Sequence, residues 1–115
     1  MVFCLFPLSV SHVLADKSAV KIDAPEQVSK GSEVVIKVTV THSSNNIFHY
    51  TDWVSIKADG KEIGRWEYSM TNRPEEAVFT KEVTIPVNKD LEIEAEANCN
   101  LHGSAGVDRK RISVK

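Results

Sequence analysis

The sequence has no excess of basic charge, no long hydrophobic run and no helical periodicity. Its 115 residues include 14 Lys and Arg against 16 Asp and Glu, and the longest basic run is Arg109-Lys110-Arg111. Nucleic-acid binding therefore has no electrostatic basis. The length allows one ordinary domain and excludes an enzyme with separate cofactor and substrate domains. A composition that is 42% hydrophobic and 26% charged is typical of a globular protein and excludes disordered or rod-like classes.

Charged side chains are missing from residues 1–15, because every Asp, Glu, Lys and Arg lies from Asp16 onward. The apolar run 2–10 is shorter than the ~20 residues of a membrane span but suits the core of a secretory signal. Val13-Leu14-Ala15 supplies small residues before a cleavage site. We therefore predict a signal peptide over 1–15, a single domain over 16–115, export to the periplasm, and no stable membrane anchor after cleavage. A buried first strand is the alternative, although Pro7 counts against it.

Cysteine is scarce, with only Cys4 and Cys99 in the chain. Cleavage before Asp16 would remove Cys4, so the exported domain would have one thiol and no internal disulfide, despite its oxidising compartment. A single exported cysteine can serve as a metal ligand, a nucleophile, an intermolecular bridge or an inert buried residue. The residues around Cys99 have to distinguish these roles.

Strand-like alternation dominates the rest of the sequence. In residues 33–41, EVVIKVTVT, valine and isoleucine occupy every second position, which is typical of a half-buried strand. Asp59-Gly60 suits a tight hairpin turn between strands over 53–58 and 61–68. Further strands are predicted over 20–22, 77–87, 91–97 and 107–114. About seven short strands indicate an all-β fold, namely an immunoglobulin-like antiparallel β-sandwich.

The histidines of the predicted domain lie at strand ends. His42 follows the strand 33–41, His49 closes the next loop, and His102 comes three residues after Cys99, in a turn with Asn98 and Asn100. The apolar parity of strand 91–97 places Cys99 on the core side. Thiolate and imidazole together suit Fe, Zn or Cu, so these residues are candidate metal ligands.

Other roles for these residues stay open. Taken alone, each histidine is more simply explained as a surface polar residue, and Cys99 as a small buried one. The metal site is favoured only because all of them lie at strand-end loops. A nucleophilic Cys99 paired with a histidine is a further alternative. This nucleophilic role is disfavoured because a small domain with short loops has few residues that could form a substrate cleft and an oxyanion hole.

Residues 97–103, ANCNLHG, resemble the C-N-x-H-G ligand loop of superoxide reductases, the desulfoferrodoxin and neelaredoxin family. Residues 22–31, the pair His42 and His49 followed by Trp53, and the segment 64–67 resemble other parts of that family's domain, in the same order. The similarity covers about residues 17–104. It implies an immunoglobulin-like sandwich with a mononuclear iron held by four equatorial histidines and one axial cysteinate, the sixth position being open.

Carried over by position, Cys99 would be the axial ligand, and His42, His49 and His102 three of the equatorial ligands. The fourth histidine is missing, because Ser18 stands at its place. The loop between His42 and His49 is one residue longer than in the family, and Ser104-Ala105 replaces an aromatic residue. Lys17 matches the family's lysine near the open site, so the resemblance implies a catalytic role for it in attracting the substrate. A surface lysine without that role is the alternative.

The resemblance implies that the iron, alternating between Fe(II) and Fe(III), reduces superoxide to hydrogen peroxide. The electron would come from an external one-electron donor protein, because the chain has no second cysteine cluster. One alternative is a non-catalytic electron-transfer or metal-binding domain with copper or zinc, since Cys with two His is the ligand set of blue copper. Another is an interaction module whose site has decayed. The sequence leaves open whether the chain forms a homo-oligomer.

Overall fold

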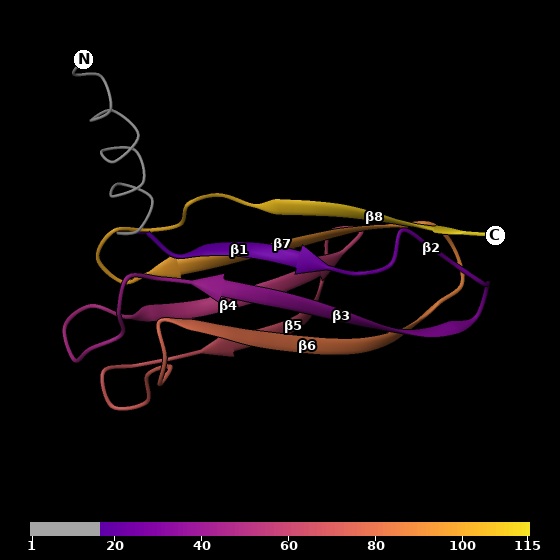
Figure 1. The fold of residues 1–115 in the computed structure, drawn as a ribbon. Helices are drawn as coiled ribbons and strands as arrows, with labels where there is room; N and C mark the ends of the chain where they lie inside the picture. The colour runs from indigo at the N-terminus through magenta and orange to yellow at the C-terminus, as the bar shows by residue number, and fades with distance from the viewer. Residues whose placement is uncertain (1–16) are drawn as a thin grey trace, which may run out of the picture.

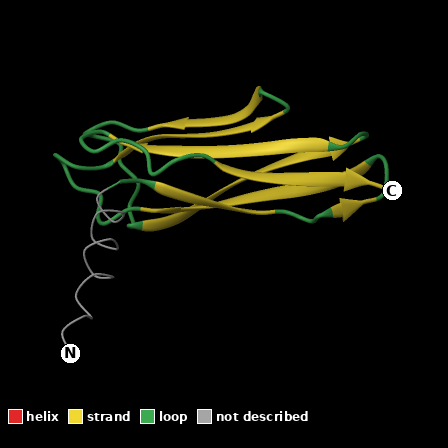
Figure 2. Ribbon diagram, turned by 90° about the horizontal axis from the view of Figure 1, so that it is seen from above, coloured by secondary structure: helices red, strands yellow, loops and turns green. Residues whose placement is uncertain are grey.

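The computed structural model describes residues 17–115 as two β-sheets packed face to face. Figures 1 and 2 show the two layers, with the connecting loops gathered at the two ends of the strands. The predicted signal peptide and its cleavage site before Asp16 lie outside the described residues. Within the described part, no helix is long and apolar enough to cross a membrane.

One sheet has three strands and the other has five. The first has the order β1-β3-β6, formed by β1 (Ala19–Asp23), β3 (Ser32–Thr41) and β6 (Val78–Val87). The second has the order β2-β8-β7-β4-β5, formed by β2 (Gln27–Val28), β8 (Asp108–Val114), β7 (Leu91–Cys99), β4 (Thr51–Ala58) and β5 (Lys61–Glu67). All neighbouring pairs are antiparallel except β2 and β8. The predicted all-β sandwich is confirmed. The described residues form eight strands, because the two-residue β2 is too short to leave a periodic signal.

The core lies between the two sheets and follows the alternation of β3. Val34, Ile36, Val38 and Val40 are at most 3% exposed, whereas Val35 on the opposite face of the strand is 48% exposed. The facing sheet contributes a second set of buried side chains, namely Val54, Ile56, Ile93, Ala95, Ala97 and Ile112. Burial of these apolar surfaces is the main favourable contribution to folding.

The β4–β5 hairpin turns at Asp59-Gly60 as the sequence predicts. Asp59 has φ 50° and Gly60 has φ 83°, and glycine adopts this left-handed region without steric cost. Gly64 within β5 has a different role, because a Cβ there would lie 2.8 Å from Val83 Cγ1 on β6. Its missing side chain therefore allows β5 to approach β6 closely.

The strand ends that carry the predicted ligands meet at one end of the sandwich. β1 begins there, β3 and β7 end there, and β4 begins there (Figure 1). Pairing of β4 with β7 places Thr51 opposite Cys99, and pairing of β1 with β3 places Ala19 opposite Thr41. The sandwich topology thus brings together four segments that are far apart in the sequence.

Candidate metal centre

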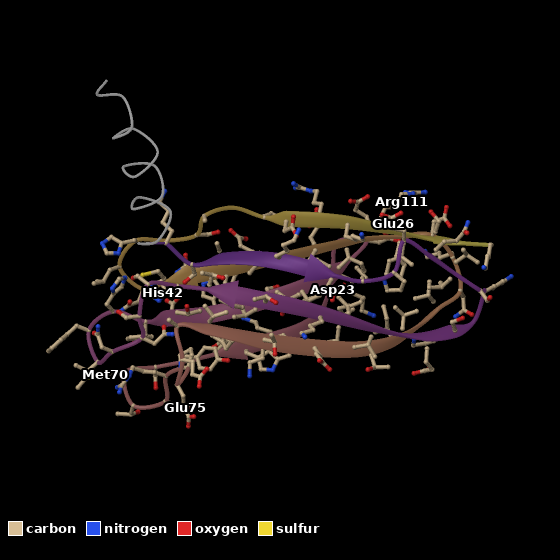
Figure 3. All side chains as sticks on the ribbon, in the orientation of Figure 1. Asp23, Glu26, His42, Met70, Glu75 and Arg111 are labelled. Carbon is tan, nitrogen blue, oxygen red and sulfur yellow. The ribbon has the colours of Figure 1, made fainter. Side chains whose placement is uncertain are left out.

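Three imidazoles and one thiol converge at this end. His49 Nε2 lies 3.2 Å from His42 Nε2 and 3.1 Å from His102 Nδ1. Cys99 Sγ lies 3.9 Å from His102 Nδ1, and the ligand atoms of His42, His49 and Cys99 are all within 4.8 Å of one another. Figure 3 shows His42 at the same end of the sandwich as Met70 and Glu75, far from Glu26 and Arg111. All four predicted ligands are therefore brought to one place.

The nitrogen spacing fits binding to a single metal ion. Two imidazole nitrogens at about 2.0–2.1 Å from one ion lie roughly 2.9–3.4 Å apart when the angle between them is 90–109°. Both nitrogen separations at His49 fall in this range. Hydrogen bonding alone explains this arrangement less well. A neutral imidazole has at most one hydrogen on Nε2, so His49 Nε2 cannot donate good hydrogen bonds to both His42 and His102. Imidazole with thiolate selects Fe, Zn or Cu rather than Mg or Ca.

The centre is buried on one side and open on the other. His42 is 2% exposed and Cys99 is 1% exposed, whereas His49 is half-buried and His102 is exposed. Burial lowers the pKa of His42 below its ordinary value of 6.5, and repulsion from His49 and His102 lowers it further, while the hydrogen bond to Asn45 opposes the shift. At neutral pH His42 is therefore held in the neutral form that binds a metal.

The backbone after Cys99 folds tightly around the sulfur. Cys99 and Gly103 exchange two backbone hydrogen bonds of 2.9 Å each, and Gly103 has φ 85°. In this turn the backbone N–H of His102 donates a hydrogen bond to Cys99 Sγ, with an N–S distance of 3.4 Å. The turn therefore places a backbone donor of the same loop beside the sulfur.

Asparagine side chains fasten the two ligand loops to each other. Asn100 Oδ1 accepts from Tyr50 N at 2.9 Å, and Asn100 Nδ2 donates to Phe48 O at 3.2 Å. Asn98 Nδ2 donates to Asp52 Oδ1 at 2.9 Å. The sequence places Asn98 and Asn100 in the turn around Cys99, but it did not reveal these bonds to the other loop. Partners about 50 residues away leave no local pattern.

The loop between His42 and His49 forms an exposed turn. Asn46 N donates to His49 O at 2.8 Å, and Asn46 Oδ1 accepts from Phe48 N and His49 N at 3.0 Å. The turn closes on itself before β4 begins. The Nε2 atoms of the two histidines that flank this turn lie 3.2 Å apart.

Ser18, at the place of the missing histidine, is fully buried beside the centre. Its Oγ forms a 2.8 Å hydrogen bond with Thr51 Oγ1, and its backbone binds Gly103 O at 3.3 Å and Ala105 N at 2.9 Å. Thr51 is also fully buried. This position thus holds a pair of hydroxyls that satisfy each other, and residues 17–115 contain no further histidine.

Lys17 immediately precedes Ser18 and is half-buried. Because Ser18 N donates to Gly103 O, the backbone of Lys17 adjoins the loop that carries Cys99 and His102. The catalytic role of Lys17 stays a prediction.

Comparisons with known proteins point to one family. The sequence model of the family described as Desulfoferrodoxin matches residues 12–105. Among solved structures, the superoxide reductase (neelaredoxin) from Ignicoccus hospitalis is similar with a TM-score of 0.70 and 26% identity, covering 86% of this chain and 82% of that one. A superoxide reductase (neelaredoxin) variant from Archaeoglobus fulgidus has a TM-score of 0.60 and 16% identity, covering 91% and 94%. At that identity the likeness shows the fold alone.

The same fold also occurs in proteins of other kinds. The sulfur carrier protein SoxY from Chlorobium limicola f thiosulfatophilum has a TM-score of 0.59 and 11% identity, covering 95% of this chain and 94% of that one. A search of curated proteins finds no match. Function therefore has to be argued from the family and from the centre rather than from the sandwich.

Proposed function

Because this chain belongs to the desulfoferrodoxin family, we propose that it is a superoxide reductase-like iron protein that reduces superoxide to hydrogen peroxide. His42, His49, His102 and Cys99 would hold the iron. The observation that carries the proposal is the convergence of three imidazole nitrogens and one sulfur at one end of the sandwich. The 26% identical neelaredoxin supports the choice of superoxide as substrate.

The three imidazoles and the thiol suit a redox-active metal ion, and the exposed side of the centre would let a small anion reach that ion. When bound, ferrous iron supplies one electron to superoxide, which takes up two protons and becomes hydrogen peroxide. Cys99, 1% exposed, provides an anionic donor that solvent does not reach, while the exposed His102 leaves the other side accessible. Four protein ligands leave an iron ion with further coordination positions, as in other open iron sites.

The electron for each turnover would come from an external one-electron donor protein. Cys99 is the sole cysteine among the described residues, so this part of the chain has no second thiolate-bound centre. The exposed edge of His102 provides a short route from the surface to the centre.

The proposed activity is tested by loading the protein anaerobically with Fe(II) and adding a known pulse of superoxide. We expect one peroxide per iron oxidised and no release of oxygen. The same protein loaded with Zn²⁺ is the control, because zinc has no redox chemistry and should leave superoxide to decay at its background rate. If iron does not bind, or binds and stays reduced after the pulse, the reductase proposal is wrong and a copper or zinc domain takes its place.

Replacing Lys17 by alanine is expected to slow the oxidation of the ferrous centre by superoxide about tenfold, because a local positive charge raises the encounter rate with an anion. The difference should shrink with added salt, and Lys17→Arg should keep the rate. Stopped-flow kinetics at several ionic strengths measure this. Lys21→Ala, at an exposed position on β1, is the control. Equal slowing in both alanine variants would leave Lys17 with no special role.

A further inference from the structure

The side chain of Asn45 joins three segments beside the candidate centre. It lies in the loop after β3 and is half-buried. Its Oδ1 lies 3.1 Å from His42 Nδ1 and accepts a 2.8 Å hydrogen bond from Thr51 N, and its Nδ2 donates to Glu76 O at 2.8 Å. One amide thus contacts a ligand histidine, the first residue of β4 and the segment leading into β6.

The two backbone partners fix the orientation of this amide. Thr51 N can only donate a hydrogen bond, so the atom that faces it is the oxygen of Asn45. Glu76 O can only accept, so the atom that faces it is the nitrogen of Asn45. Rotating the amide by 180° would oppose two donors at Thr51 and two acceptors at Glu76, so both hydrogen bonds would be lost.

The fixed amide in turn determines which nitrogen of His42 carries a hydrogen. Asn45 Oδ1 can only accept, so His42 Nδ1 must donate to it. In the neutral ring this leaves a lone pair on Nε2, the atom that lies 3.2 Å from His49 Nε2. The opposite tautomer would set an unpaired Nδ1 against Asn45 Oδ1 and place a hydrogen between the ligand nitrogens.

We propose that Asn45 is a positioning residue that holds His42 in the Nδ1–H tautomer and so presents its Nε2 lone pair to the metal. This rests on the metal centre of the proposed function but not on its reaction with superoxide. Outer partners of this kind orient ligand histidines, and their loss typically weakens metal binding by about 10–100-fold. The bonds to Thr51 N and Glu76 O fix the amide before any metal arrives.

Two substitutions separate positioning from simple anchoring. Asn45→Asp keeps an acceptor for His42 Nδ1 and Thr51 N but removes the donor to Glu76 O. Asn45→Leu removes both the acceptor and the donor, while the side chain keeps a similar size. We expect the leucine variant to bind Co²⁺ about 10–100-fold more weakly than the wild type, and the aspartate variant to stay close to the wild type, because carboxylate partners also support metal-bound histidines.

The measurement is a titration of the metal-free protein with Co²⁺, followed through the absorption of the cobalt–thiolate bond. Asn72→Leu is the matched control, because Asn72 is exposed and its hydrogen bonds with Ser69 are made by the backbone. It should bind cobalt like the wild type. Urea unfolding of each metal-free variant separates loss of affinity from loss of fold.

A second readout needs no metal. Long-range ¹H–¹⁵N correlation spectra of the metal-free protein report which ring nitrogen of His42 carries the hydrogen. We expect Nδ1–H in the wild type and in Asn45→Asp, and a shift toward Nε2–H in Asn45→Leu. An unchanged tautomer and unchanged cobalt affinity in the leucine variant would overturn the proposal.

Equal weakening in the aspartate and leucine variants would also overturn it, because Asn45 would then act as an anchor to Glu76. Failure of the proposed function is recognised separately. A protein that binds cobalt as expected but ignores superoxide with iron bound would refute the reductase activity and leave the role of Asn45 intact.

Discussion

Replacing Cys99 by alanine should lower the affinity of the centre for Fe(II) by about 100-fold or more, beyond the range seen when only an outer partner is lost. The thiolate is the one anionic donor in the set, and its removal leaves three neutral imidazoles of which one is exposed. Competition with a chromophoric chelator measures the affinity. The absorption band of the metal–thiolate bond should disappear as well.

The metal-free fold should tolerate this substitution. Cys99 is 1% exposed and lies on the core side of β7, where alanine occupies the same kind of position at Ala95 and Ala97. We expect a loss of about 1 kcal/mol in the free energy of unfolding, the scale of one small buried group. Ser104→Ala in the same loop is the control and should keep both iron and absorption band. Wild-type iron affinity in Cys99→Ala would refute the proposed ligand set.

Replacing Ile36 by alanine should lower the free energy of unfolding by about 2–5 kcal/mol, because the substitution opens a cavity between the two sheets. Ile36 is fully buried. Its neighbour Val35 on the opposite face is 48% exposed, so Val35→Ala should change stability by about 0.5 kcal/mol or less. Urea unfolding of the metal-free proteins measures both, with the slope of the transition expected to stay constant.

This pair of variants tests the alternation on which the predicted fold depends. A similar loss of stability in both would mean that β3 does not have one buried and one solvated face. A large loss in Val35→Ala alone would mean that the register of β3 is displaced by one residue, since such a shift exchanges the two faces of a strand.

Much of the fold could be predicted because its signals are local. The valines of β3 alternate with polar residues, and Asp59-Gly60 marks the hairpin between β4 and β5. The parallel pairing of β2 with β8 could not be predicted, because two residues carry no period and their partners lie 86 residues away. The glycine of β5 is understood only from its contact with β6.

The candidate site was predicted less completely than the fold. Cys99 and the three histidines are predicted as ligands from their residue types and loop positions, and the fold brings these side chains close together. The supporting side chains were not predicted, because Asn45 and Asn100 act through hydrogen bonds to other segments. A serine at position 18 signals a missing ligand, but its burial and its bond to Thr51 appear only in the folded chain. Export to the periplasm and the catalytic role of Lys17 stay predictions.

The most direct test of the central claim is a crystal structure of the iron-loaded protein, with anomalous scattering recorded at the iron edge. We predict a single iron peak bonded to His42 Nε2, His49 Nε2, His102 Nδ1 and Cys99 Sγ. An iron peak elsewhere on the sandwich, or one bonded to the imidazoles but not to the sulfur, would contradict the account.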